Sequence, residues 1–214
     1  MRQMFHVRIV ARLFVAVVLV SCAGRISSNQ LAWKLEGAKI PAGYETYTLF
    51  FSTDSGYGDR EAAQRLEALQ REFKSFGDSI GARNLAVWVN EPGLDRLSVS
   101  RGKEFADLFA RTSRSSLDYN DGPFVVVCDR HPDLFDAASG GVEAPPRAIV
   151  LSFRGVSPDR VGEVLNFVEA SIRRDSVDAR RIGMQALWVK MKSWWEQTDR
   201  TFVKQVILTL ITKA

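Results

Sequence analysis

The sequence predicts an α/β domain in which a mixed β-sheet is flanked by helices. Between about residues 45 and 175, short runs of β-branched and aromatic residues are interspersed with three stretches of helical periodicity. The runs are apolar throughout rather than alternating, which indicates a sheet covered on both faces. Hydrophobic residues make up 46% of the chain and charged residues 25%, which is typical of a domain with a packed core.

The first strand and the first helix are predicted from two adjacent segments. Residues 47–53 (YTLFFST) predict a buried strand, and the turn-forming residues 54–59 (DSGYGD) follow it. A helix is expected over residues 60–80, because apolar side chains recur there at spacings of three and four. These side chains are Ala62, Leu66, Leu69, Phe73, Phe76 and Ile80.

The second strand and the second helix follow the same pattern. Residues 85–89 (LAVWV) predict a buried strand, which Pro92 and Gly93 break. Ser100 is expected to cap the next helix. Its inward side chains are Phe105, Leu108 and Phe109.

Two further strands precede the third helix. Residues 124–128 (FVVVC) and 148–153 (AIVLSF) predict strands joined by a loop, so they are able to pair as a hairpin. Ser157 is expected to cap a helix that begins at Pro158. Its apolar face consists of Val161, Val164, Leu165, Val168 and Ile172.

This order of elements is similar to the thioredoxin-like fold. In that family a Cys-x-x-Cys motif follows the first core strand at the start of the long helix, and a cis-proline precedes the third strand. Here the motif is replaced by Ser55, Gly56, Tyr57 and Gly58, and Pro123 occupies the place of the cis-proline. The resemblance implies a cis peptide bond before Pro123, close to the degenerate motif.

The replaced motif argues against redox chemistry. Thiol–disulfide exchange needs a nucleophilic thiolate and a second thiol, and Ser55 and Gly58 supply neither. The resemblance therefore implies a redox-inactive domain that acts as a binding or scaffolding module without a cofactor. The alternative is an atypical thiol-dependent enzyme or redox factor that uses Cys128, although a free cysteine at the end of a strand is more often a buried apolar residue.

The N-terminus has the pattern of a secretory signal. A segment with three arginines and no acid precedes the apolar residues 13–20 (LFVAVVLV), a run too short for an ordinary membrane-spanning helix. Residues 19–22 (LVSC) resemble the lipobox of bacterial lipoproteins, in which the cysteine is acylated and becomes the first residue of the mature protein. A plain signal peptide or an uncleaved anchor is the alternative.

The lipobox implies an envelope protein held on a membrane by a lipid on Cys22 and facing the periplasm. Ala23 follows the cysteine instead of the Asp that favours inner-membrane retention, so the outer membrane is expected. The predicted organisation is a signal peptide at 1–21, a lipid-anchored tether at 22–44, a thioredoxin-like domain at 45–175 and an amphipathic helical extension at 176–214.

Charge and side-chain chemistry exclude several classes of function. The formal charge of +4 falls to +1 without Arg2, Arg8 and Arg12, so the sequence does not predict nucleic-acid binding. His131 is the only histidine outside the predicted signal peptide. With Cys128 and Asp133 it does not complete a tetrahedral site, so no metal is expected.

The C-terminal extension is cationic and rich in tryptophan. Seven basic residues and two acids lie between Arg180 and Ala214. One helix is expected around residues 184–195 and a second over 202–211. The predicted interaction surface consists of Trp188, Trp194, Trp195, Phe202 and Ile207. Such helices dock on their own domain, lie on an anionic membrane or bind an envelope protein partner, and the sequence leaves these alternatives open.

Overall fold

The fold is seen in a computed structural model of the chain. The structure describes residues 39–54, 59–81, 83–91, 94, 96–113, 122–135, 147–176, 189, 191–193, 196 and 208–212. None of the helices within these residues is long and apolar enough to cross a membrane.

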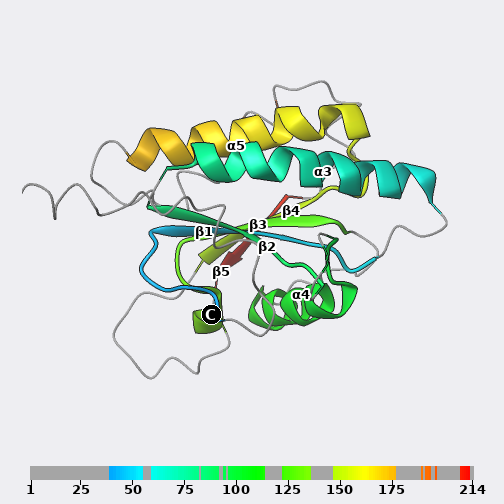
Figure 1. Cartoon of the computed structure of the whole chain (residues 1–214). Helices are drawn as coiled ribbons and strands as arrows, with labels where there is room; N and C mark the ends of the chain where they lie inside the picture. Colours follow the sequence, from blue (N-terminus) through cyan, green and yellow to red (C-terminus); the bar gives the residue numbers. More distant parts are fainter. Residues whose placement is uncertain are drawn as a thin grey trace, which may run out of the picture.

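A five-stranded mixed sheet forms the centre of the molecule (Figure 1). Its strand order is β2-β1-β3-β4-β5, with β1 and β2 parallel and all other neighbours antiparallel. The strands are β1 (Thr46–Phe51), β2 (Asn84–Trp88), β3 (Phe124–Cys128), β4 (Arg147–Ser152) and β5 (Leu208–Thr212). The first four lie where the sequence predicts strands, and β3 and β4 pair as the expected hairpin.

Helices cover both faces of this sheet (Figure 1). The helices α3 (Arg60–Ser79) and α5 (Val161–Ser176) pack together on one face, and α4 (Val99–Ser113) lies on the other. Two short 3₁₀ helices, η2 (Pro132–Phe135) and η3 (Pro158–Arg160), complete the described elements. The predicted fold class is confirmed, because element order, strand order and helix placement are those of a thioredoxin-like α/β fold.

An aromatic cluster forms the core between the sheet and the pair α3 and α5. The ring of Phe50 lies 5.0 Å from Phe73, 5.3 Å from Phe76 and 6.1 Å from Trp88. All four side chains are buried. Burying each contributes about 1.5–3 kcal/mol, and the edge-to-face contacts add to this.

The core on the α4 face is also aromatic, and it includes a residue that precedes β1 in the chain. Phe51 packs against Phe105, Phe109 and Phe124 at centroid distances of 5.9, 6.4 and 5.3 Å. Ile40 is buried in the same cluster. Packing against the sheet therefore begins within the segment that the sequence predicts to be a tether.

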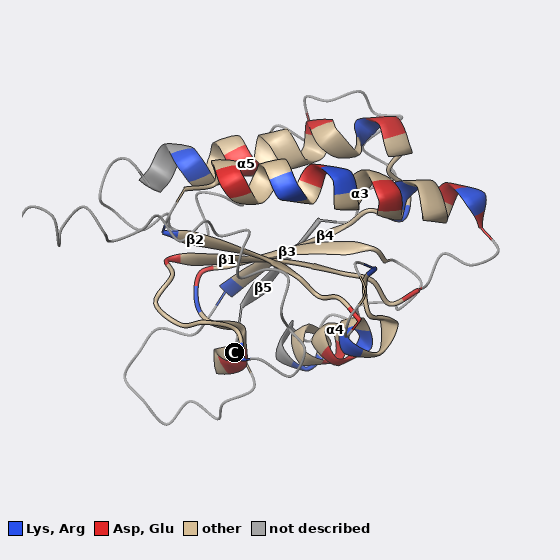
Figure 2. Cartoon of the chain, in the orientation of Figure 1, with Lys and Arg blue, Asp and Glu red and all other residues tan. Residues whose placement is uncertain are grey.

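Charged residues lie mainly on the helices, whereas the strands carry few (Figure 2). Both signs alternate along α3 and α5, with ion pairs such as Arg173 to Glu169 at 3.1 Å. The surface of α3 and α5 is therefore of mixed sign.

Two predicted helix caps differ in the structure. Helix α4 begins at Val99, and Ser98 rather than Ser100 caps it: the Arg101 N–H donates to Ser98 Oγ at 3.4 Å. Ser157 precedes Pro158 as expected, but its hydroxyl donates to the Asp159 carboxylate instead of accepting from the helix backbone. That hydrogen bond lowers the pKa of Asp159. The Ser157 hydroxyl therefore bonds to a nearby carboxylate instead of to a backbone N–H of the helix.

The C-terminal extension is not helical throughout. Residues 189, 191–193 and 196 are helical, and the buried Met191 belongs to the core cluster that contains α3 and α5 side chains, so docking of this part on the domain is confirmed at Met191. The helix predicted over 202–211 is wrong for residues 208–211, which belong to β5 (Leu208–Thr212); this strand pairs with Arg147 to Leu151 of β4. The segment LTLIT is rich in β-formers, and pairing satisfies the backbone groups at the edge of β4.

Candidate functional site

The end of the sheet where β1 finishes leads into the segment that the sequence predicts to be a degenerate redox motif. After β1, the Ser52 hydroxyl donates to the Asp54 carbonyl oxygen at 2.6 Å and accepts from the Asp54 N–H at 3.2 Å, which forms a tight turn. Helix α3 starts at Arg60, six residues after Asp54. The predicted motif residues Ser55, Gly56, Tyr57 and Gly58 lie outside the described residues.

The peptide bond between Gly122 and Pro123 is cis, which confirms that prediction. The Phe153 N–H donates to the Pro123 carbonyl oxygen at 2.8 Å. A Cβ added to Gly122 would lie 2.7 Å from Thr53 Oγ1, so this loop passes close to Thr53, two residues before Ser55. The expected contact of Pro123 with Tyr57 itself stays a prediction.

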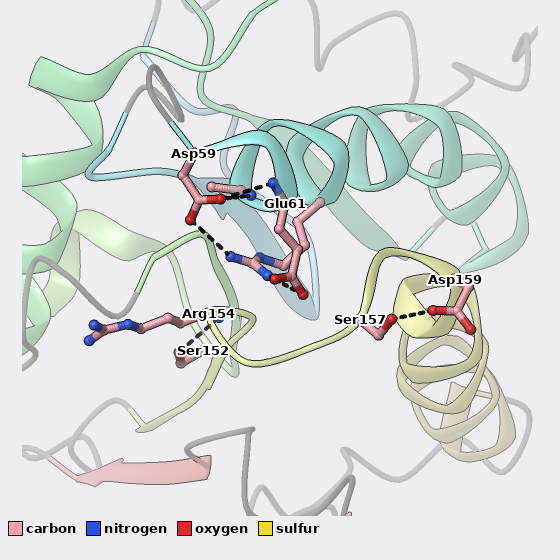
Figure 3. A network of polar contacts seen from close by, with 8 residues as sticks. Asp59, Glu61, Ser152, Arg154, Ser157 and Asp159 are labelled. Carbon is pink, nitrogen blue, oxygen red and sulfur yellow. Dashed lines mark hydrogen bonds and ion pairs between the residues drawn. The ribbon is translucent and has the colours of Figure 1, made fainter.

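Asp59 occupies the N-terminus of α3 (Figure 3). Its Oδ1 accepts hydrogen bonds from the backbone N–H groups of Glu61 at 2.9 Å and Ala62 at 3.3 Å. The buried guanidinium of Arg65 lies 3.9 Å from Asp59 Oδ2 and 3.2 Å from Glu61 Oε1. A helix N-terminus lowers a thiol pKa through its unsatisfied N–H groups and positive dipole, and here a carboxylate already satisfies two of those groups.

Cys128 lies at the opposite end of β3 from Pro123. It pairs with Tyr47 near the start of β1, whereas Phe124 pairs with Phe51 beside the motif. At about 3.3 Å of rise per residue, Cys128 is on the order of 15 Å from that end of the sheet. Its thiol is buried, and desolvation followed by the charge of Asp129 raises the pKa well above the ordinary value. These properties disfavour a thiolate at Cys128.

His131 connects the segment before β1 to the body of the domain. Its Nε2 lies 2.7 Å from the Ile40 carbonyl oxygen, and its Nδ1 accepts from the Asp133 N–H at 3.2 Å. Nε2 therefore carries the proton in this arrangement. The ring also packs edge-on against Tyr47 at 5.3 Å. Both ring nitrogens are thus engaged with backbone, and no grouping of three metal-ligating side chains occurs among the described residues.

A pocket of about 290 Å³ lies between α3, the end of β2 and the segment that leads into α4. Its walls are mainly apolar, and charged side chains lie among them. The lining residues are Asp54, Ala63, Leu66, Glu67, Gln70, Trp88, Glu91, Arg96, Leu97 and Val99. Asp54 also belongs to the turn after β1, so the pocket adjoins the approach to the degenerate motif.

Sequence reasoning missed this pocket, although part of its signal was present. Ala63, Leu66, Glu67 and Gln70 recur at helical spacing and form a stripe on α3. Leu66 packs against the core as predicted, but it is only half-buried and also lines the pocket. A stripe of apolar and polar residues beside the core-facing stripe indicates a second, partly exposed surface on α3.

Several predicted sites lie outside the residues that the structure describes. They are the lipidation site Cys22 and the C-terminal side chains Trp188, Trp194, Trp195, Phe202 and Ile207. Of the extension, the described side chain of Val189 is exposed and that of Met191 is buried.

Comparison with known proteins does not extend this description. No protein-family model, no curated protein and no solved structure matches the chain. The strand order and the helix placement of the described residues are consistent with a thioredoxin-like α/β fold.

Proposed function

We propose that the chain is a redox-inactive thioredoxin-like binding module that a lipid on Cys22 holds on a membrane of a bacterial envelope, facing the periplasm. The observation that supports the proposal is that Cys128 lies at the opposite end of the sheet from the cis-proline. The cis-proline and the N-terminus of α3 lie at one end, and the buried Cys128 lies at the other. Ser55 and Gly58 occupy the thiol positions in the sequence.

The geometry supports binding in preference to thiol chemistry. Exchange requires a thiolate that is accessible to a disulfide, and burial opposes both ionisation and access at Cys128. The loop that contains Pro123 and the turn that contains Thr53 still lie side by side. In this proposal, a partner rests on this end of the sheet without encountering a reactive thiol pair.

Insulin reduction tests the redox part of this proposal. The full chain in detergent is expected to give no turnover above the dithiothreitol background, and Cys128→Ala is expected to behave identically. Labelling of native protein with a maleimide should likewise leave Cys128 unmodified until urea unfolds the domain. Turnover that disappears in Cys128→Ala would instead establish the atypical thiol enzyme.

Membrane attachment tests the lipid anchor. Replacement Cys22→Ser should abolish acylation, because serine provides no thiol for the lipid. Most of the protein should then move from the membrane fraction to the soluble fraction, since acyl chains supply the anchoring free energy. Metabolic labelling with an alkyne fatty acid measures acylation, and Cys128→Ser is the matched control. A Cys22→Ser protein that is still acylated and membrane-bound would refute the lipobox interpretation.

A further inference from the structure

We propose that β5 pairs antiparallel with β5 of a second copy of this chain, so that the two sheets join about a two-fold axis at Leu210. This inference goes beyond the proposed function, because it concerns the edge of the sheet and depends neither on the lipid nor on the absent thiol pair. β5 is the last strand in the order β2-β1-β3-β4-β5, and within the described part of the chain the strand paired with it is β4.

The hydrogen bonds of β4 define which of its backbone groups point towards β5. The Asp129 N–H donates to the Arg147 carbonyl oxygen at 3.1 Å, so Arg147 directs its backbone groups towards β3. Phe153 does the same, since its N–H donates to the Pro123 carbonyl oxygen at 2.8 Å. These groups alternate along an antiparallel strand, so every second residue of β4, starting at Ala148, directs them towards β5.

The register between β4 and β5 then defines the groups of β5 that point away from the sheet. Ile211 pairs with Ala148, and Thr209 pairs with Val150. Both of these β5 residues therefore use their N–H and C=O groups on β4. The outward N–H and C=O groups belong to Leu208, Leu210 and Thr212. They recur at every second position and are placed symmetrically about Leu210.

This set of outward groups is self-complementary. A two-fold axis at Leu210 lets its N–H and C=O groups bond to those of Leu210 in the second copy. Leu208 then lies opposite Thr212 of the second copy and exchanges hydrogen bonds with it on either side of the axis. Every outward group of β5 gains a partner in this arrangement, and the pairing of β5 with β4 is unchanged.

The sequence in and before β5 favours a second copy as the partner strand. The strand LTLIT contains no charged residue and no proline, and its pairing with β4 runs without a bulge. Edge strands that resist self-association usually carry one of these features, and two uncharged copies do not repel each other. The preceding residues 202–207 (FVKQVI) contain no Gly, Pro, Asn or Asp, so the sequence predicts no tight turn that folds them back on β5.

The opposite edge of the sheet makes the assembly a closed dimer. β2 is the strand at that edge, and each of its residues is at most 3% exposed. A third copy therefore finds no accessible strand at β2. Since the two β5 strands use each other's outward groups, the pairing closes and does not continue into a filament.

Sedimentation equilibrium of the full chain in density-matched neutral detergent tests the dimer. The weight-average protein mass should rise towards twice that of the chain as the concentration increases. Thr212→Pro removes an outward N–H and places a proline ring at the interface, so the dissociation constant should rise at least tenfold. The matched control Thr212→Ala keeps that N–H and should associate like the wild type.

Hydrogen exchange provides a second measurement that needs no substitution. Exchange of the Leu210 amide, followed by ¹H–¹⁵N NMR on the wild type, should slow as the protein concentration rises. A wild-type mass that stays monomeric, or a concentration-independent exchange rate at Leu210, would overturn the β5 interface. A folded Thr212→Pro protein that associates as tightly as Thr212→Ala would do the same. A mass that grows beyond two copies would overturn the closed dimer.

Discussion

Replacement of Gly102 by alanine is expected to destabilise the domain by about 3 kcal/mol. Gly102 lies in α4 where that helix meets the end of β1, and an added Cβ would overlap the Ser52 carbonyl oxygen and lie 2.7 Å from its carbonyl carbon. Both atoms belong to the backbone, so relief requires α4 to move away from the sheet. The melting temperature followed by circular dichroism should fall by roughly 6–12 °C.

Gly162→Ala is the matched control for this result. Gly162 also lies in a helix, α5, but a Cβ there would meet Glu72 Cδ at an ordinary 3.5 Å. The better helix propensity of alanine should leave stability unchanged or raise it slightly. A Gly102→Ala protein that melts with the wild type would show that the close approach of α4 to β1 is not a feature of the molecule.

A chain that ends at Thr198 should lose about 3–5 kcal/mol of unfolding free energy. This truncation removes β5, which pairs with β4 from Arg147 to Leu151. The backbone groups on that side of β4 would lose their partners, and the new edge would favour association between chains. Urea unfolding followed by fluorescence measures the loss, and light scattering measures the association.

Two further truncations locate the source of that stability. A chain ending at Thr212 retains β5 and should unfold like the full chain. A chain ending at Arg180 also lacks the buried Met191 and should be less stable than the chain ending at Thr198. If all three unfold together, neither β5 nor the segment around Met191 docks on the domain.

The central elements of the fold could be predicted because their signals are local. Uninterrupted apolar runs gave β1 to β4, and spacings of three and four gave α3, α4 and α5. The cis bond at Pro123 came from resemblance, since an X–Pro pair alone favours trans. Ser98 and Ser100 are two residues apart, and helix boundaries at this precision depend on details of packing.

β5 could not be predicted, because its conformation depends on a distant partner. The apolar residues of LTLIT are compatible with a strand and equally with part of the apolar stripe of a helix. The choice is decided by β4, whose free edge lies about 60 residues earlier in the chain. The pocket was missed for a similar reason: helical spacing places Leu66 near the core face but does not show whether another element covers it.

Restoring the two thiols tests the central claim most directly. The claim is that Ser55 and Gly58 occupy the positions of a redox pair in an otherwise thioredoxin-like domain. The double variant Ser55→Cys with Gly58→Cys should form an internal disulfide in oxidised glutathione, detected as the loss of both thiols in mass spectrometry. It should also reduce insulin above the wild-type background, whereas Ser55→Cys alone should not. A folded double variant that keeps both thiols free and shows no turnover would contradict the account.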